Sequence, residues 1–513
     1  MLLRSELLCA IAFWREELVE LEILLSYRFL ETHRQMFSWQ VGFLLIARKI
    51  AAGFDDISSK ASESAVPRKE IPPAARMRLA LTNATRNQEI VRMKVIAGKI
   101  LGLTIAPLFS VDAAFATDGY FLTGYGTKQQ GQGGAGIAKP GDSLTGATNP
   151  AGLVLVGDRF DIGLTVFRPV RFGTITGNQL PPGYPNVNGT YDGNRVQNFE
   201  LPELGYSFRY KPNLALGVAI YGNGGLNTSY KQPIQLLGST RGGVDLDQVF
   251  ISPTLSYKLG AHNYLGVAAN IAIQRFAAEG LQSIEAISSA PTKVTNNGYS
   301  YSSGAGVRIG WLGELNHTVS VGATWQSKTY VSKFSKYSGL FAEQGGFDIP
   351  SNFAGGAAVK LGPRATVIFD EERILYGSVK SIANTLASTS PLGSNSGPGF
   401  GWHDINVSKA GLDYVINPSL TVRGGYNHGG APFDGTQTFF NLVAPAVTKD
   451  HLHVGATWAS STGKEISFAY IHAFNGTVNG VNSIPAAYGG GNANLSMYQN
   501  SFQVAFGWNR NKK

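Results

Sequence analysis

The strongest constraint on the fold of this chain is an alternation of apolar and small or polar residues that recurs through its C-terminal three-quarters. The first clear example places apolar residues at every second position: Phe160, Ile162, Leu164 and Val166. Asp161, Gly163 and Thr165 stand between them. Because successive side chains of a β-strand point to opposite faces, a period of two predicts a strand with one apolar face.

The same pattern continues in pairs of segments joined by short connections rich in Gly, Pro, Asn and Ser, which is typical of β-hairpins. The predicted hairpins pair 204–210 with 214–220, 249–257 with 265–273, 307–311 with 319–325, 353–361 with 365–376, 403–415 with 419–428, and 450–459 with 465–474. A last alternating segment lies at 502–508. Six hairpins and two single strands predict fourteen strands, an even number.

The connections between these strands alternate between tight turns and longer segments, such as 170–200, 277–303 and 330–352. Long loops at one end and short turns at the other are typical of a barrel in the bacterial outer membrane. No run of eighteen apolar residues occurs, which argues against a membrane-spanning helix. Four tryptophans stand near predicted strand ends, where interfacial aromatics are expected: Trp311, Trp325, Trp458 and Trp508. A soluble β-sandwich explains the alternation equally well, but not the strand number or the one-sided loops.

Residues 93–116 have the pattern of a secretory signal peptide that begins at an internal methionine. Lys94 and Lys99 supply a positive n-region, and residues 100–111 form an apolar core. Ala114-Phe115-Ala116 has the small-x-small pattern of a cleavage site. We expect cleavage after Ala116 and export of residues 117–513; a short buried helix is the alternative. Residues 1–92 have helical spacing and are either a helical extension or a segment upstream of the true start, and the second hypothesis is favoured.

The segment 117–157 lies between the cleavage site and the first strand, and it does not alternate. Gly131, Gly133 and Gly136 formally match a dinucleotide-binding motif, but no strand precedes them and Pro140 interrupts the helix that should come next. Fourteen strands enclose a lumen too wide for side chains alone to fill. We therefore predict a hatch at 117–157 inside a barrel at 158–508, with a polar tail at 509–513.

The exported part, 117–508, resembles the FadL-type outer-membrane transporters of long-chain fatty acids and aromatic hydrocarbons. The resemblance is carried by Asn149-Pro150-Ala151-Gly152 before the first strand, by the pattern at 204–218, and by the pattern at 421–426. It implies an all-β, fourteen-stranded antiparallel transmembrane barrel with an N-terminal hatch. It also implies passive, hatch-gated uptake of hydrophobic compounds, with Asn149 to Gly152 holding the hatch and Thr117 and Asp118 in a pocket inside the barrel. The leader and the polar tail depart from the family pattern.

Two further sets of residues are candidates for contact with a substrate. The segment 330–352 is rich in apolar side chains, among them Phe334, Leu340, Phe341, Phe347 and Ile349. They either form an apolar groove that collects substrate or pack on neighbouring loops. Arg308 and Arg423 alternate with apolar neighbours and should face the lumen, where they either hold a substrate carboxylate or pair with acidic residues of the wall.

The sequence gives little support to other functions. His451 and His453 share one strand face without a third ligand, so we expect no metal site and no cofactor. His403-Asp404 lacks a G-x-S-x-G nucleophile, so an enzyme is not expected. The net charge of +9 is not clustered, which argues against nucleic acid. A polar porin is the main alternative, and a barrel hydrolase or adhesin a lesser one. The expected partners are outer-membrane lipid, lipopolysaccharide and the barrel-assembly machinery, with the protein a monomer.

Overall fold

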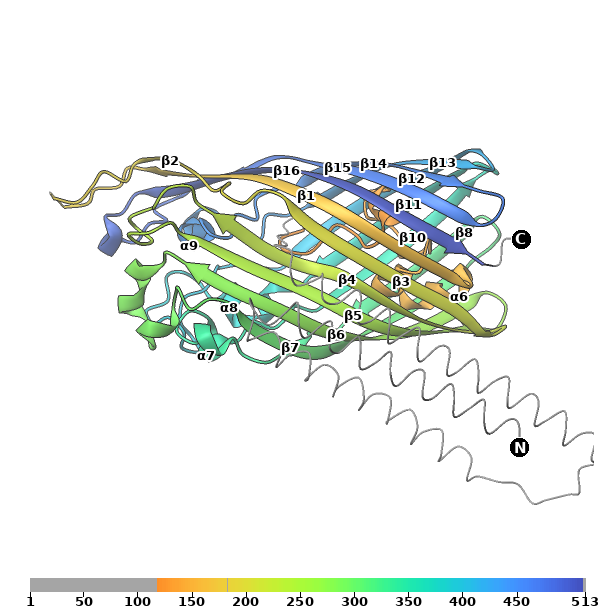
Figure 1. Ribbon diagram of the computed structural model, residues 1–513, viewed down its shortest axis with the longest axis horizontal. Coiled ribbons are helices and arrows are strands. Elements are labelled where there is room, and N and C mark those ends of the chain that lie inside the picture. The colour runs from red at the N-terminus through yellow and green to blue at the C-terminus, as the bar shows by residue number, and fades with distance from the viewer. Residues whose placement is uncertain (1–117, 182, 511–513) are drawn as a thin grey trace, which may run out of the picture. The chain divides into compact units, whose positions relative to one another are not determined.

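The structure, a computed structural model, describes residues 118–181 and 183–510, which form a closed antiparallel β-barrel with a segment packed inside it (Figure 1). Within these residues, fourteen strands make the wall, each paired with its neighbours in chain order, and β16 pairs with β1 to close the ring. Two short strands, β2 (Gly189–Asp192) and β9 (Tyr330–Val331), pair with the outer parts of β1 and β7. The predicted fourteen-stranded barrel is confirmed.

Each of the wall strands corresponds to one of the fourteen predicted strands. They are β1 (Arg159–Thr176), β3 (Phe199–Lys211), β4 (Leu214–Ser229), β5 (Gly243–Leu259), β6 (Asn263–Glu279), β7 (Ser300–Glu314), β8 (Val319–Gln326), β10 (Asn352–Leu361), β11 (Ala365–Ile374), β12 (Ile405–Asn417), β13 (Leu420–Gly429), β14 (Asp450–Ala459), β15 (Lys464–Val478) and β16 (Asn492–Asn509).

The alternation in β1 separates the outer face of the wall from the lumen. Ile162 and Leu164 are 43% and 38% exposed, whereas Asp161 and Thr165 are buried. Leu164 lies opposite Val504 of β16, which is also exposed, so the outward apolar row continues across the closure. Such a row suits contact with lipid, and the polar row between faces the inside.

Several strands extend further than their alternation predicts. β1 reaches Thr176 and forms a hairpin with β2, so part of the predicted loop 170–200 is a paired ribbon (Figure 1). β6 likewise extends to Glu279. Beyond the apolar band the backbones still pair, because each buried N–H and C=O needs a partner. Outside this band the strand does not need an apolar outer face, so the alternation of apolar and polar residues stops before the strand ends.

The hatch begins at the first described residue and ends where β1 starts. It contains the short helices α4 (Thr127–Gln130), α5 (Thr145–Thr148) and α6 (Leu153–Val156), and a 3₁₀ turn at Pro150–Gly152. Most of its side chains are buried, and it contacts strands on opposite sides of the ring, including β5 and β15. Phe121 pairs with Gly224 where the register of β4 shifts between Gly222 and Gly224. No helix in the described segments is long and apolar enough to cross a membrane.

The long loops gather at one end of the barrel and fold inward on one another (Figure 1). They carry α7 (Ala342–Gly345), α8 (Lys380–Ala383) and α9 (Thr438–Asn441), and 3₁₀ turns at Gln282–Ile287, Pro291–Lys293, Ser335–Tyr337, Tyr376–Ser378, Gly435–Gln437 and Ala486–Tyr488. Their apolar side chains join those of the hatch in one buried cluster, which includes Tyr120, Phe276, Phe341 and Trp402. The loop end and the hatch therefore share a single core.

Candidate transport site

The Asn149 side chain forms hydrogen bonds within the hatch and between the hatch and the wall. Its Oδ1 accepts a hydrogen bond from the Ala151 N–H at 3.1 Å, which caps the 3₁₀ turn. Its Nδ2 donates to the carbonyl oxygens of Ile137 at 2.8 Å and of Trp311 in β7 at 3.0 Å. The Ser256 hydroxyl of β5 donates to the Ala151 carbonyl at 2.7 Å. This predicted motif is buried and lies directly against the strands.

Two glycines of the wall allow the hatch backbone to approach this closely. A Cβ atom on Gly266 of β6 would lie 2.2 Å from the carbonyl carbon of Pro150. A Cβ atom on Gly310 of β7 would lie 2.0 Å from Asn149 Oδ1. Gly152, the last residue of the motif, is itself crowded, because a Cβ there would lie 2.9 Å from Pro140 Cβ. Gly266 therefore packs against the hatch backbone, and Gly310 against the Asn149 side chain, at distances that leave no room for a side chain on either glycine.

Carboxylates of the wall hold the hatch backbone at two further places. Glu203 of β3 accepts hydrogen bonds from the Thr127 N–H at 3.2 Å and from the Thr127 hydroxyl at 3.3 Å. Asp370 of β11 accepts from the N–H groups of Gly136 at 2.6 Å and Ile137 at 3.0 Å. Charge-assisted bonds of this kind are stronger than neutral ones. They fix the hatch to strands on different sides of the ring.

Ion pairs add two more attachments. Lys128 of the hatch lies 2.6 Å from Glu465 of β15; Glu465 is buried and Lys128 is half-buried. Lys139 pairs with Asp413 of β12. Asp413 also lies 3.3 Å from Arg423 of β13, so this predicted lumen cation is paired with an acid of the wall.

Arg308, the other predicted lumen cation, also faces inward and is buried. Its guanidinium donates to the Thr148 carbonyl of the hatch at 3.0 Å and to Gln326 Oε1 at 2.6 Å. It therefore attaches the hatch through the Thr148 carbonyl, while the Gln326 amide holds the guanidinium from the neighbouring strand β8.

The predicted N-terminal pocket lies outside the described residues at Thr117, but Asp118 is described and buried. Asp118 Oδ2 accepts from Asn427 Nδ2 at 3.3 Å and lies 3.7 Å from Lys409 Nζ of β12. Lys409 also donates to Glu372 of β11 at 2.7 Å. The start of the hatch thus meets a buried lysine that is shared between two acidic groups.

Aromatic rings lead from this lysine toward the loops. Tyr376 donates its hydroxyl to the Asp118 carbonyl at 2.5 Å, and its ring centroid lies 5.3 Å from that of Tyr120. The ring of Trp402 is 5.1 Å from Tyr376, and Phe400 is 6.2 Å from Trp402. These are ordinary aromatic contact distances, so the rings form a continuous column.

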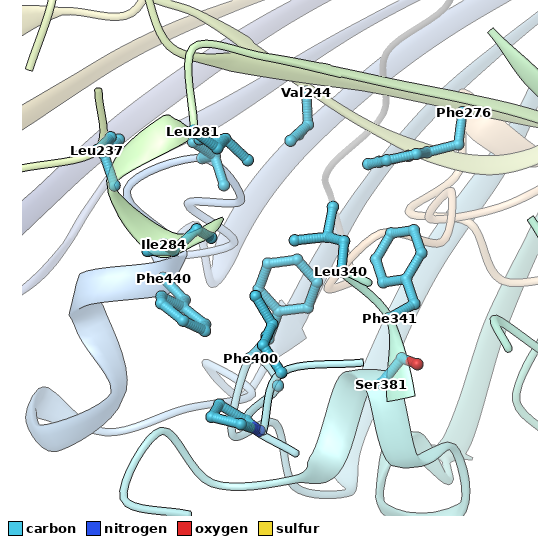
Figure 2. Close-up of a pocket in the computed structure, with 14 residues that line it drawn as sticks. Leu237, Val244, Phe276, Leu281, Ile284, Leu340, Phe341, Ser381, Phe400 and Phe440 are labelled. Carbon is cyan, nitrogen blue, oxygen red and sulfur yellow. The ribbon is translucent and has the colours of Figure 1, made fainter. Parts of the chain in front are cut away.

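The outer end of the column opens on a cavity of about 40 Å³. Figure 2 shows side chains from β6 and from several outer loops converging on it. Its lining includes Phe276, Leu340, Phe341, Ser381, Phe400 and Phe440. The hydroxyl of Ser381 is the polar side-chain group among the lining residues, and it donates to the Gly346 carbonyl. The cavity is therefore an apolar space lined mainly by loops.

The five predicted loop residues divide into two groups around this cavity. Leu340 and Phe341 line it, whereas Phe334, Phe347 and Ile349 are buried beside it rather than exposed in an open groove. The apolar loop side chains therefore pack inward on neighbouring elements, and two of them line the cavity.

Ring contacts tie this loop to β6 and to the hatch. The ring of Phe341 lies 4.6 Å from Phe276 and 4.8 Å from Phe347, and Phe347 is 6.3 Å from Tyr120. Burial raises the pKa of Tyr337, so its hydroxyl stays protonated and donates to the Gly298 carbonyl at 2.7 Å.

The histidines of the described segments take no part in the column or the cavity. His451 and His453 are buried on the lumen side of β14, and His453 Nδ1 lies 2.6 Å from the Gln130 carbonyl. Asp404 pairs with Arg373 at 3.3 Å rather than serving His403. Among the described residues, no group of three His, Cys, Asp or Glu side chains could hold a metal ion.

Sequence reasoning did not identify Phe276, Trp402, Lys409 or Glu372 as site residues. Trp402 and Phe400 stand in a Gly-rich connection with no periodic pattern, and Phe276 lies past the alternating part of β6. Lys409 stands at a lumen-facing position in the alternation of β12, so a cation inside the barrel could have been predicted there from the sequence. Its pairing with Glu372 depends on the register between β11 and β12.

Comparison with solved structures supports the fold. The toluene transporter TodX of Pseudomonas putida is 18% identical, with a TM-score of 0.58 over 76% of this chain and 99% of that chain. A Pseudomonas aeruginosa FadL homologue is 16% identical, with a TM-score of 0.58 over 76% and 100%. The toluene transporter TbuX of Ralstonia pickettii is 17% identical, with a TM-score of 0.52 over 75% and 98%.

A comparison with curated protein sequences finds no match. The profile of one family, by contrast, matches residues 109–506, which is most of the chain. That family is described as outer membrane protein transport protein (OMPP1/FadL/TodX). The protein belongs to this family of outer-membrane transport proteins.

Proposed function

We propose that this protein takes up small hydrophobic compounds across the outer membrane by diffusion through the barrel. The observation that carries the proposal is the unbroken run of apolar and aromatic side chains from the outer cavity to Tyr120 and Asp118. The polar surface of the outer membrane slows apolar compounds, and an apolar passage inside the barrel offers them a way around it.

The proposed path has three stages. The compound enters among the outer loops at the cavity lined by Leu340 and Phe341. It then moves along the rings of Phe400, Trp402 and Tyr376 to the pocket at Asp118. Movement of part of the hatch then permits release toward the periplasm. No catalytic step and no energy source are part of the proposal. The relatives named as toluene transporters support the substrate class.

We also infer the surroundings in which the barrel works. The outward apolar row, with Leu164 and Val504 exposed, suits contact with membrane lipid, and the loop end suits contact with lipopolysaccharide. Insertion requires the barrel-assembly machinery. The ring is closed by its own β1 and β16, so a monomer is sufficient to complete the wall.

The test places a charge in the cavity. Leu340→Asp puts a carboxylate on a half-buried lining residue, and an ionised group in an apolar space carries a large desolvation cost. We expect uptake of a labelled aromatic hydrocarbon to fall roughly tenfold in cells that lack other carriers.

Val481→Asp is the matched control, because Val481 lies on another outer loop, is exposed, and does not line the cavity. It should leave uptake unchanged. Equal uptake by the two variants would show that compounds do not pass through this cavity.

A further inference from the structure

The cavity offers the head group of a fatty acid no favourable position. Ser381 supplies the one polar side-chain group in the cavity lining, and its hydroxyl proton is already donated to the Gly346 carbonyl. No charged side chain of the described residues lines the cavity. An ionised carboxylate that entered would lose its water and gain no partner, which is costly.

The first buried cation met at the inner end of the column is Lys409, and the chain's own acids already hold it. Glu372 accepts from Lys409 Nζ at 2.7 Å, and Asp118 Oδ2 lies 3.7 Å away on the hatch side. Asn427 donates to the same oxygen of Asp118. A substrate carboxylate would have to displace one of these acidic groups and would then lie beside the other, and like charges at short range repel.

The two predicted lumen cations, Arg308 and Arg423, already contact other groups of the protein. Arg423 pairs with Asp413. Arg308 donates to the Thr148 carbonyl of the hatch and to Gln326 of β8, and it does not line the cavity. A substrate carboxylate at Arg423 would have to displace Asp413, whereas Arg308 is buried against the hatch.

The size of the cavity points in the same direction. Its volume of about 40 Å³ is small, since an apolar cavity that holds benzene measures roughly 150 Å³. Leu340 and Phe400 are half-buried lining residues and can turn aside for a compact guest. A ring-sized hydrocarbon needs a local rearrangement of such side chains, whereas a long acyl chain needs a much longer cleared path.

We propose that this transporter selects uncharged, compact hydrocarbons and discriminates against fatty acid anions. Asp118 and Glu372 already interact with Lys409, the cation that a substrate carboxylate would otherwise bind. The inference rests on the proposed function and names its substrate class. Asp118 and Glu372 act here as specificity-determining residues, through Lys409.

The test measures uptake of labelled toluene by cells that lack other carriers, with and without excess oleate. The protein should raise toluene uptake above that of cells without it, oleate should not compete, and labelled oleate should enter no faster than in cells without the protein. Uptake of oleate as fast as toluene, or full competition by oleate, would overturn the inference while leaving the proposed function intact. Uptake of neither compound would overturn the proposed function itself.

A pair of variants tests the role of the acids. Glu372→Gln removes one of the two acidic groups at Lys409 and should make binding of oleate to the purified protein about tenfold tighter, as expected for one charge-assisted bond. Glu371→Gln is the matched control on the same strand, because Glu371 points outward and accepts from Ser408. Gel mobility before and after boiling verifies folding. A properly folded Glu372→Gln protein with unchanged oleate affinity would contradict the role given to Lys409.

Discussion

Two glycines determine how closely the hatch approaches the wall, and they can be tested singly. We expect Gly266→Ala to push the Pro150 turn away and lower the free energy of unfolding by about 1–3 kcal/mol, as overpacking does. Urea unfolding in detergent micelles measures the change. Gly424→Ala on β13 is the control, because a Cβ there has no atom within 4 Å. Equal losses in the two variants would mean that the hatch does not rest on Gly266.

The Asn149 side chain should matter for transport more than for the wall. Asn149→Ala removes the cap of the 3₁₀ turn and leaves two carbonyl acceptors without their donor, which costs about 1–3 kcal/mol locally. We expect altered hydrocarbon uptake and faster proteolysis within the hatch, while the unboiled protein still migrates as a folded barrel. Asn186→Ala, in the exposed β1–β2 hairpin, should change neither. Unaltered uptake in Asn149→Ala would remove the gating role from this motif.

The sequence located some of these residues and not others for a physical reason. Asn149 to Gly152 form a short motif that is recognisable in the sequence alone, and Asp118 is the second residue after the expected cleavage site. Lys409 becomes meaningful only beside Glu372 on another strand and Asp118 on the hatch, and those contacts require the three-dimensional register.

The hatch as a unit can be separated from the barrel that encloses it. Deleting residues 118–148 removes no hydrogen bond of the β1–β16 closure, so the barrel should still fold. The deletion frees Glu203 and Asp370 from the hatch groups that they hold. We expect a large rise in single-channel conductance in planar bilayers, with selectivity for cations. Conductance equal to that of the intact protein would show that the hatch does not block the lumen and would favour the polar-porin alternative.

Elements with a repeating pattern were predicted more completely than those without one. The fourteen strands are predictable from alternation and turn residues, and their pairing from chain order. The outer loops carry α7, α8 and α9, one turn each, which have no period long enough to detect. The apolar residues at 334–349 could form an exposed groove or pack inward, and the outcome depends on contacts with β6 and the other loops. These elements are distant in sequence.

The closed ring should behave as one cooperative structure. Val504 of β16 lies opposite both Leu164 of β1 and Phe468 of β15, so it has a strand on each side. Val504→Pro removes a donor from the closure and should greatly reduce the fraction that migrates as a folded band before boiling. Val504→Ile keeps the donor and the outward apolar side chain and should fold normally. A full yield of folded Val504→Pro protein would mean that the ring does not depend on this closure.

The attachments of the hatch also fix an order of events. The hatch precedes the whole barrel in the chain, yet its anchors lie on β3, β5, β7, β11, β12 and β15. The contact between Lys128 and Glu465 joins residues 337 positions apart. Contacts at such separation form late, because the intervening chain must first be ordered. The hatch is synthesised before the strands, but it is therefore among the last segments to reach its final position. While the ring is incompletely closed, the hatch lacks most of its contacts with the wall.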